Sequence, residues 1–248
     1  MSSATSRRRP LTRERVRAAA LAVADRDGLG GVTMRSVADV LGVEAMALYR
    51  HVSGKHDLLD SLVEVVVEEI NAACAALPEL DNPAEWRTAL RRRIRTARAI
   101  MQRHPWAPGL VATNGTLGPA LMRYFDDFGA IMLAGGFSVD TVHHALHAFG
   151  SRALGFSPEL FQPQAPAVVE SGLDPAAAVA DLEALADEFP FIARMARDLS
   201  HDAESTLGWC DDEAEFDFGL DVLLDGLELR RRLDVSASES ERAEARNP

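Results

Sequence analysis

The chain contains 248 residues, of which 47% are apolar and 26% charged, enough for one large or two small globular domains. This composition excludes intrinsically disordered and fibrous proteins. No apolar run of about 18 residues occurs, and no apolar stretch follows the arginine-rich N-terminus, so neither a membrane-spanning helix nor a secretory signal is predicted. We therefore expect a soluble, cytoplasmic protein without a membrane partner.

The formal net charge of −12 is distributed unevenly along the chain. Residues 1–60 carry ten basic and seven acidic side chains, which gives this segment a net charge of +3. The other residues carry sixteen basic and thirty-one acidic side chains, a net charge of −15. Because phosphate binding needs Lys and Arg on the contacting surface, only the N-terminal segment suits a nucleic-acid partner. The two charge regimes predict two modules.

Four helices are predicted in the N-terminal part, from apolar residues at helical spacing and from capping signals between them. Their expected ranges are 12–27, 33–42, 44–50 and 53–76. The expected N-caps are Thr12, Thr33 and Ser53, and the expected stops are Gly28 and Gly42.

The C-terminal part also has helical periodicity, and alternation typical of strands is rare in it. Helices are expected at 86–104, 119–134, 138–155 with Ser138 as N-cap, from Pro175 onward, and at 212–232. We expect a turn-like stretch at 105–118, a long loop at 157–173 and a disordered tail over 233–248. The predicted fold class is all-α.

Residues 32–51 have the layout of a helix-turn-helix. Ala38 is small where two helices must approach closely, and Gly42 can adopt the left-handed conformation of the turn between them. Leu48, six residues further on, would face the core. An ordinary helical hairpin is the alternative interpretation.

The residues around this motif suit contacts with phosphate groups. A helix N-terminus presents hydroxyls and free backbone N–H groups, and polar side chains follow the second helix of the motif. Lys55 is the only lysine of the sequence. At a helix start its charge is unfavourable to the helix dipole, so a phosphate partner explains it better than a solvated position does. The phosphate-contacting candidates are Thr33, Ser36, Tyr49, His51 and Lys55.

Residues 11–70, with the core TMRSVADVLGVEAMALYRHVSGKHDLLDSL, resemble the DNA-binding domain of the tetracycline-repressor (TetR/AcrR) family of transcriptional regulators. A weaker resemblance, to the ligand-binding domain of the tetracycline repressors, rests on Trp86, Gly136-Phe137-Ser138 and Leu154-Gly155. The resemblance implies a three-helix helix-turn-helix DNA-binding domain, followed by a larger helical ligand-binding and dimerisation domain. The implied division is a flexible basic arm at 1–10, the DNA-binding domain at 11–57, the larger domain at 58–232 beginning with a connecting helix, and the tail at 233–248.

The same resemblance implies which residues touch bases. The base-contacting candidates are Arg35, Glu44, Ala45, Met46 and Ala47. The last three offer only apolar contacts, for example to thymine methyl groups, so Arg35 is the predicted polar reader. The two alanines are equally well explained by helix propensity. The arginines of the N-terminal arm would add salt-dependent affinity or have no specific role.

The resemblance also implies a ligand pocket in the C-terminal domain. The family's magnesium-binding histidine has no counterpart in the loop that follows His104, so recognition of magnesium-tetracycline is not expected. The remaining candidates are mostly apolar or aromatic, which suits a hydrophobic small-molecule effector, although each could instead be a core residue. The ligand-binding candidates are Asn71, Met101, Trp106, Met122, Phe125, Phe128, Met132, His143, His147 and Glu159.

Three histidines, His143, His144 and His147, leave three interpretations open: a metal site, hydrogen bonding in the pocket, or exposed side chains. No nearby Cys or carboxylate completes a zinc site. Cys74 and Cys210 are too few for a disulfide framework. Because no catalytic constellation or glycine-rich phosphate loop is present, we predict no enzyme activity, no cofactor and no resident metal.

The sequence therefore predicts a homodimeric repressor that binds a palindromic double-stranded DNA operator and is released by the effector. The resemblance implies that the dimer forms through the helix at 138–155 and the last helix, whose apolar stripe is Phe216, Leu220, Leu223 and Leu227. An intramolecular core would have the same stripe. A ligand-independent or activating regulator of the same fold is the first alternative, and a helical small-molecule-binding protein or enzyme the second.

Overall fold

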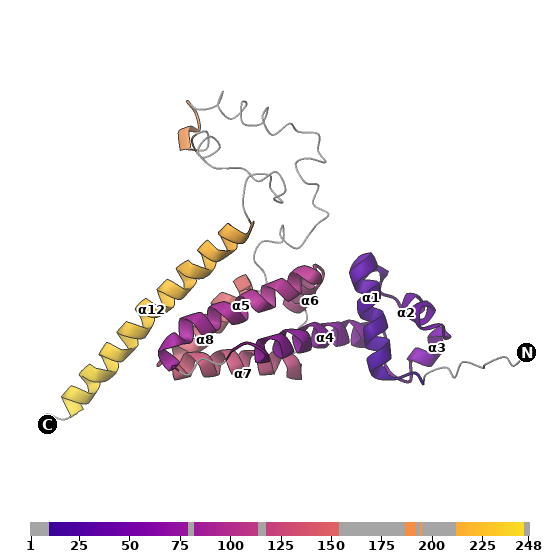
Figure 1. Cartoon of the computed structure of the whole chain (residues 1–248), viewed down its shortest axis with the longest axis horizontal. Helices are drawn as coiled ribbons and strands as arrows, with labels where there is room; N and C mark the ends of the chain where they lie inside the picture. Colours follow the sequence, from indigo (N-terminus) through magenta and orange to yellow (C-terminus); the bar gives the residue numbers. More distant parts are fainter. Residues whose placement is uncertain are drawn as a thin grey trace, which may run out of the picture. The chain divides into compact units, whose positions relative to one another are not determined.

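The computed structural model describes residues 10–78, 82–113, 118–153, 187–191, 194 and 212–245. Within these ranges the regular structure is entirely helical, which confirms the all-α prediction, and no helix there is long and apolar enough to cross a membrane. The elements are α1 (Arg13–Gly31), α2 (Met34–Leu41), α3 (Ala45–Leu48), α4 (Lys55–Ala75), the 3-10 helix η1 (Pro83–Glu85), α5 (Trp86–Arg103), α6 (Ala107–Thr113), α7 (Pro119–Ala134), α8 (Val139–Ala153) and α12 (Asp212–Ala245) (Figure 1).

The chain divides into two compact units. The first comprises Met1–Ala76 with Ala99–Tyr124, and the second Leu77–Arg98 with Phe125–Pro248. Unlike the predicted division after residue 57, this one keeps α4 whole within the first unit. The reason is that Leu58 and Leu62 of α4 are fully buried in the same core as α1, α2 and α3.

The first unit has a core of small and aliphatic side chains. Its best-buried members include Val16, Ala20, Val23, Ala24, Val32, Val37, Leu48, Leu58 and Leu62. Leu48 therefore occupies the inward position that the helix-turn-helix pattern predicts. Trp106 precedes α6 and Leu110 lies within it. Both side chains pack against the same core while remaining partly exposed.

The predicted ends of α2 are confirmed. Thr33 is the N-cap and forms a capping box with Ser36. Gly42 follows the last helical residue in the left-handed region, with φ 64° and ψ 39°. The N–H of Val43 then donates to the carbonyl of Ala38 at 3.1 Å, which closes the turn. The motif thus has its two helices and its glycine turn where the spacing places them.

Gly28 and Ser53 act differently at the neighbouring helix ends. Gly28 interrupts α1 with φ 69°, as a helix stop would, but one further turn continues to Gly31. The N-cap of α4 is Gly54 and not the predicted Ser53, and no side chain forms a capping hydrogen bond there. Instead Asp57, in the first turn, accepts a hydrogen bond from the Ser53 N–H at 2.8 Å. The Asp57 carboxylate therefore holds the residue before the N-cap and does not cap a helical N–H group.

Three other expectations need correction or lie outside the described ranges. The predicted turn-like stretch at 105–118 contains α6. The predicted disordered tail is wrong for 233–245, since α12 continues to Ala245. This segment is polar but lacks Gly and Pro and is rich in Ala and Glu, so helix propensity sustains it. The arm at 1–9, the loop at 157–173, the helix from Pro175 and Cys210 lie outside the described residues.

The second unit is held together by an apolar core of aromatic and aliphatic residues from α5, α7, α8 and α12. The core comprises Trp86, Leu90, Ile94, Phe128, Met132, Phe137, Val142, Ala145, Phe149, Phe216, Leu220 and Leu224. Trp86 meets Phe137 edge to face, with ring centroids 4.7 Å apart. Of the stripe predicted for dimerisation, Phe216 and Leu220 are buried in this core, and Leu223 and Leu227 pack against it.

A ladder of ion pairs joins α5 to α12 beside this core. Arginines at 87, 91, 95 and 98 face acidic residues at 225, 221, 217 and 213, so the two helices run antiparallel. The Arg87–Asp225 pair measures 2.6 Å and the Arg98–Glu213 pair 3.1 Å. Because both series repeat at nearly every helical turn, the ladder fixes the register of α12 on α5.

Candidate functional site

The helix-turn-helix presents a short, exposed second helix. Leu48 anchors α3 in the core, while Met46, on the opposite side of the helix, is 74% exposed. Glu44 is exposed at the N-cap without a side-chain cap bond, and Ala45 and Ala47 are half-buried. Arg35 is exposed in the first turn of α2. All five predicted base-contacting residues therefore lie at the surface of consecutive elements.

The hydroxyls predicted to bind phosphate at the start of α2 already have partners. The N–H of Ser36 donates to Thr33 Oγ1 at 3.0 Å, and the N–H of Thr33 donates to Ser36 Oγ at 2.9 Å. Ser36 Oγ also donates to the carbonyl of Gly31 at 2.7 Å. The backbone N–H groups of Met34 and Arg35, by contrast, have no intrahelical acceptor, since they belong to the first turn. An anion at this helix end would be bound by backbone groups more than by the hydroxyls.

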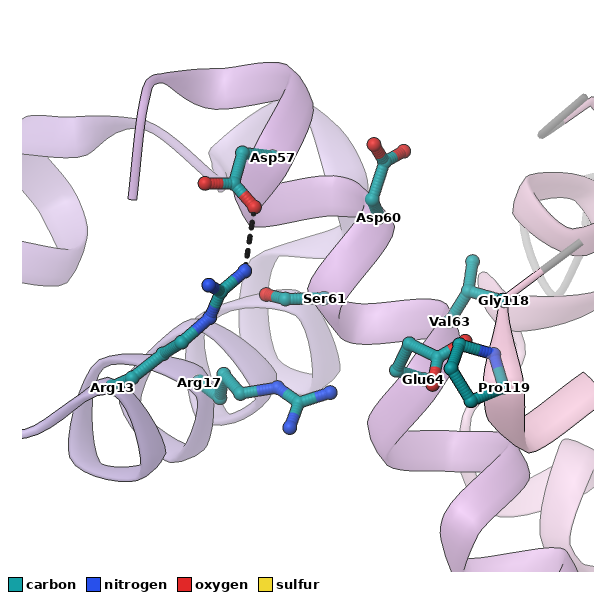
Figure 2. Close-up of a pocket in the computed structure, with 9 residues that line it drawn as sticks. All are labelled: Arg13, Arg17, Asp57, Asp60, Ser61, Val63, Glu64, Gly118 and Pro119. Carbon is teal, nitrogen blue, oxygen red and sulfur yellow. Dashed lines mark hydrogen bonds and ion pairs between the residues drawn. The ribbon is translucent and has the colours of Figure 1, made fainter. Parts of the chain in front are cut away.

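Asp57 fixes the loop that precedes α4. Its Oδ1 accepts from Arg13 Nη2 at 2.9 Å, and its Oδ2 accepts from the Ser53 N–H at 2.8 Å. Figure 2 shows the Arg13–Asp57 bond spanning the gap between α1 and α4. The carboxylate therefore ties the beginning of α1 to the loop that precedes Lys55, whose side chain is exposed. Tyr49 is exposed and His51 half-buried just before this loop.

Three cations near the motif have no anionic partner among the described residues: Arg35, Arg50 and Lys55. In the same unit Arg13 and Arg26 are paired with Asp57 and Asp27. Arg50, exposed between Tyr49 and His51, is a candidate that sequence reasoning missed. Arg50 becomes a candidate because no described acidic side chain pairs with it, and this can be seen only in the folded chain. Unpaired cations are available for phosphate groups.

Glu14, beside this surface, carries a stabilised negative charge. Hydrogen bonds from its own backbone N–H and from the Thr12 hydroxyl, with attraction to Arg17 and His51, hold its pKa below the usual value. The carboxylate lies in the first turn of α1, where it also complements the helix dipole.

A pocket of about 220 Å³ lies within the first unit, between α1, the first half of α4 and the start of α7 (Figure 2). Its lining residues are Arg13, Arg17, Asp57, Asp60, Ser61, Val63, Glu64, Gly118 and Pro119. Glu64 Oε2 accepts from the Ala120 N–H at 3.2 Å, and the Arg17 guanidinium lies 3.7 Å from Glu68. A Cβ on Gly118 would fall 1.7 Å from Glu64 Oε1, so a side chain at this position would displace the Glu64 carboxylate. None of these lining residues is among the ligand-binding candidates that the sequence predicts.

The predicted ligand-binding residues are divided between the units. In the first, Met101 is fully buried, Met122 is exposed, and Trp106 donates to Asp25. Asn71 Nδ2 donates to the carbonyl of Ala120 at 2.8 Å. In the second unit Phe128 and Met132 are core residues, Phe125 is half-buried, and His143 and His147 are exposed. Glu159 lies outside the described residues. Ligand binding by this set stays a prediction.

The three histidines are grouped on the surface of α8. The rings of His143 and His147 lie 4.7 Å apart, and His144 Nε2 is 3.7 Å from Asp140. In the described ranges no three or more metal-ligating side chains converge as a metal site would require. The interpretation as exposed histidines fits this arrangement.

Comparisons with known proteins match both parts of the chain. The model described as bacterial regulatory proteins, tetR family, matches residues 16–62, and that described as tetracyclin repressor-like, C-terminal domain, matches residues 77–231. The HTH-type transcriptional repressor DrrR1 of Streptomyces coeruleorubidus is 32% identical over 231 residues, which is 88% of this chain and 78% of that protein.

Solved structures agree with these matches. The apo structure of ActR from Streptomyces coelicolor is 22% identical in sequence. The match covers 91% of this chain and 99% of the ActR chain, with a TM-score of 0.74. Its complex with actinorhodin covers 89% and 98%, with a TM-score of 0.71. A possible TetR family transcriptional regulator from S. coelicolor A3(2) is 28% identical and covers 88% and 98%, with a TM-score of 0.66. At 22% identity, the likeness to ActR concerns the fold alone.

Proposed function

Because the chain belongs to the TetR family of transcriptional regulators, which are not enzymes, we propose that it is a homodimeric repressor released from a palindromic operator by a small, largely apolar effector. The observation that carries the DNA-binding part is the helix-turn-helix itself. Leu48 locks a short helix on the core, while Met46 and Arg35 remain exposed and Arg35 lacks an anionic partner in the described part of the chain. Such a surface can enter a major groove, with Arg35 donating to base edges.

The phosphate contacts proposed around this surface come from two places. The first-turn N–H groups of α2 form one, and Tyr49, Arg50, His51 and Lys55 form the other. The second group is held by the Asp57 bonds to Arg13 and Ser53. Contacts on both sides of the reading helix would fix its register on the duplex.

The dimer proposal is supported by an exposed apolar face of α12. Phe218 is 69% exposed, and Val222, Leu229 and Leu233 follow it at exposed positions of the same helix. They alternate with Leu220 and Leu224, which are fully buried in the core of the second unit, so α12 is apolar on two sides. Burying the outer side against a second copy would remove an apolar face from water. Two reading helices about 34–36 Å apart would then read a near-palindromic site.

The effector proposal rests on the family and on the relatives. DrrR1 is named a repressor, and ActR has been solved with actinorhodin. For the present chain, actinorhodin is therefore the first compound to test. Release needs only that the effector binds the two conformations of the protein with different affinity.

The decisive test of DNA binding is a selection from a random duplex pool, followed by fluorescence anisotropy on the enriched duplex. Arg35→Ala should weaken binding to that duplex by about 1–3 kcal/mol, or roughly 5- to 150-fold. Arg26→Ala is the matched control, because Arg26 is an exposed arginine of the same unit that pairs with Asp27 away from the motif. Equal affinities for wild type and Arg35→Ala would rule out the assigned reader.

Effector release is tested by titrating actinorhodin and other apolar aromatic compounds into the complex of protein and enriched duplex. A repressor of the proposed kind loses the duplex as the compound saturates. If saturating ligand left the DNA affinity unchanged, a ligand-independent regulator of the same fold would be the better description. A promoter-reporter measurement with and without the protein separates repression from activation.

A further inference from the structure

A polar cluster joins α1, α4 and the α5–α6 junction within the first unit. Asp25 Oδ1 lies 2.7 Å from His104 Nδ1 and accepts from Trp106 Nε1 at 2.8 Å. One carboxylate oxygen of α1 therefore serves two rings of the junction. Since a carboxylate can only accept, the bond to His104 requires a proton on Nδ1. The His104 side chain is only 9% exposed and that of Asp25 is 34% exposed, so the bond is shielded from water on the histidine side.

The opposite edge of the His104 ring faces α4. Its Nε2 is 3.3 Å from Glu69 Oε2, and Glu69 is also paired with Arg103 at 2.6 Å. A neutral imidazole has one N–H and can donate to one carboxylate at a time, whereas an imidazolium donates to both. The ring thus has two acceptors on two different helices, which gives the junction more than one bonding arrangement.

The junction is also packed on the core that supports the reading helix. Trp106 and Leu110 contact the apolar cluster that contains Leu48 of α3. The Ala107 N–H donates to the His104 carbonyl at 2.8 Å, so α6 begins directly from the bonded histidine. A shift of α6 therefore requires a change at Asp25, in this core, or in both.

At its other end, α1 is tied to the proposed phosphate-binding loop. Arg13 is bonded to Asp57, and Asp57 holds the N–H of Ser53. Helix α1 thus carries one polar anchor at the α5–α6 junction and another at the loop before Lys55. These two anchors place a single rigid element between the junction and the DNA-facing loop.

We propose that Asp25 is a positioning residue that couples α6 to the DNA-reading helices, through the carboxylate oxygen that His104 and Trp106 share. This proposal rests on the proposed DNA binding. It names the residues that connect α6 to the DNA-reading helices. Because coupling free energies are reciprocal, DNA bound at the reading helices must in turn change the surroundings of Trp106.

This reciprocity can be measured with the full chain labelled with 5-fluorotryptophan. The sequence contains three tryptophans, Trp86, Trp106 and Trp209, so three fluorine resonances are expected, and Trp106→Phe identifies one of them. The probe is the duplex enriched from the random pool. In the wild type, the Trp106 resonance should shift when this duplex binds. In Asp25→Asn that response should be lost, and affinity for the duplex should fall at least about fivefold.

Asp27→Asn is the matched control. It removes the same charge two residues further along α1, where Asp27 pairs with Arg26, and it should behave as the wild type does. Trp106→Phe removes the N–H donor to Asp25 and keeps an aromatic ring, although a smaller one, against the core. It should lower the DNA affinity in the same direction even if Asp25→Asn fails to fold. If the wild type binds the duplex and the Trp106 resonance does not shift, the coupling is overturned while the proposed DNA binding stands. Wild-type DNA affinity in both Asp25→Asn and Trp106→Phe would have the same consequence. A wild type that enriches no duplex would overturn the proposed function and the coupling with it.

Discussion

Lys55 is exposed at the first position of α4, and no described acidic residue pairs with it. If Lys55 binds a phosphate group, Lys55→Gln should lower the affinity of the protein for DNA by the same factor whatever the DNA sequence. It should also flatten the plot of log affinity against log salt concentration by about 0.9 for each protomer. The measurement is fluorescence anisotropy between about 50 and 200 mM salt. Arg123→Gln, which removes an exposed charge from α7, is the control and should leave the slope unchanged.

At the same scale, residue type and spacing predicted which side chains reach the surface but not what they bond to. Thr33 was expected to contact phosphate as well as cap α2, yet its hydroxyl and that of Ser36 are committed to the capping box. Arg50 was missed because its availability depends on where the acidic side chains lie after folding. The Arg13–Asp57 pair joins residues 44 positions apart, and no local pattern announces it.

The turn between α2 and α3 is the element whose geometry depends most on one residue. Gly42 has φ 64°, and an added Cβ would meet no atom within 4 Å, so the cost of a side chain there is conformational. Gly42→Ala should lower the free energy of unfolding by about 1–2 kcal/mol in urea titrations. Gly109→Ala, in α6 with equally open space and no positive φ, should leave stability unchanged or raise it by up to about 1 kcal/mol. Wild-type stability of Gly42→Ala would contradict this account of the turn.

Caps and apolar periodicity predicted most elements, and the failures have physical causes. The stretch at 105–118 was interpreted as turn-like, and it contains two prolines and three glycines. In the structure Pro108 occupies the first turn of α6, where the missing N–H costs nothing, and Leu110 packs on the first unit's core. The end of α12 was misjudged because polarity was taken as a sign of disorder, whereas helix formation depends on propensity.

For the whole molecule, the apolar stripe at 216–227 was expected to serve either the dimer interface or an intramolecular core, and in the structure it packs on the core of the second unit. Periodicity cannot distinguish the two uses, because both need apolar residues at helical spacing. The proposed dimer should instead bury the outer side of α12. Val222→Glu with Leu229→Glu should therefore give a monomer in analytical ultracentrifugation and weaken binding to the enriched duplex. Arg230→Glu, a charge change at the exposed position that follows Leu229, should remain a dimer.

The central claim is that a net-acidic chain reads DNA by sequence through one small basic segment. Titrating the wild-type protein with the enriched duplex and with a scrambled duplex, at physiological salt, tests this claim most directly. The account predicts affinity for the enriched duplex at least about a thousandfold above that for the scrambled one, as sequence-specific regulators achieve. Because the remaining residues carry a net charge of −15, they should repel DNA wherever the reading helices do not contact it. Equal affinity for the two duplexes would contradict the account.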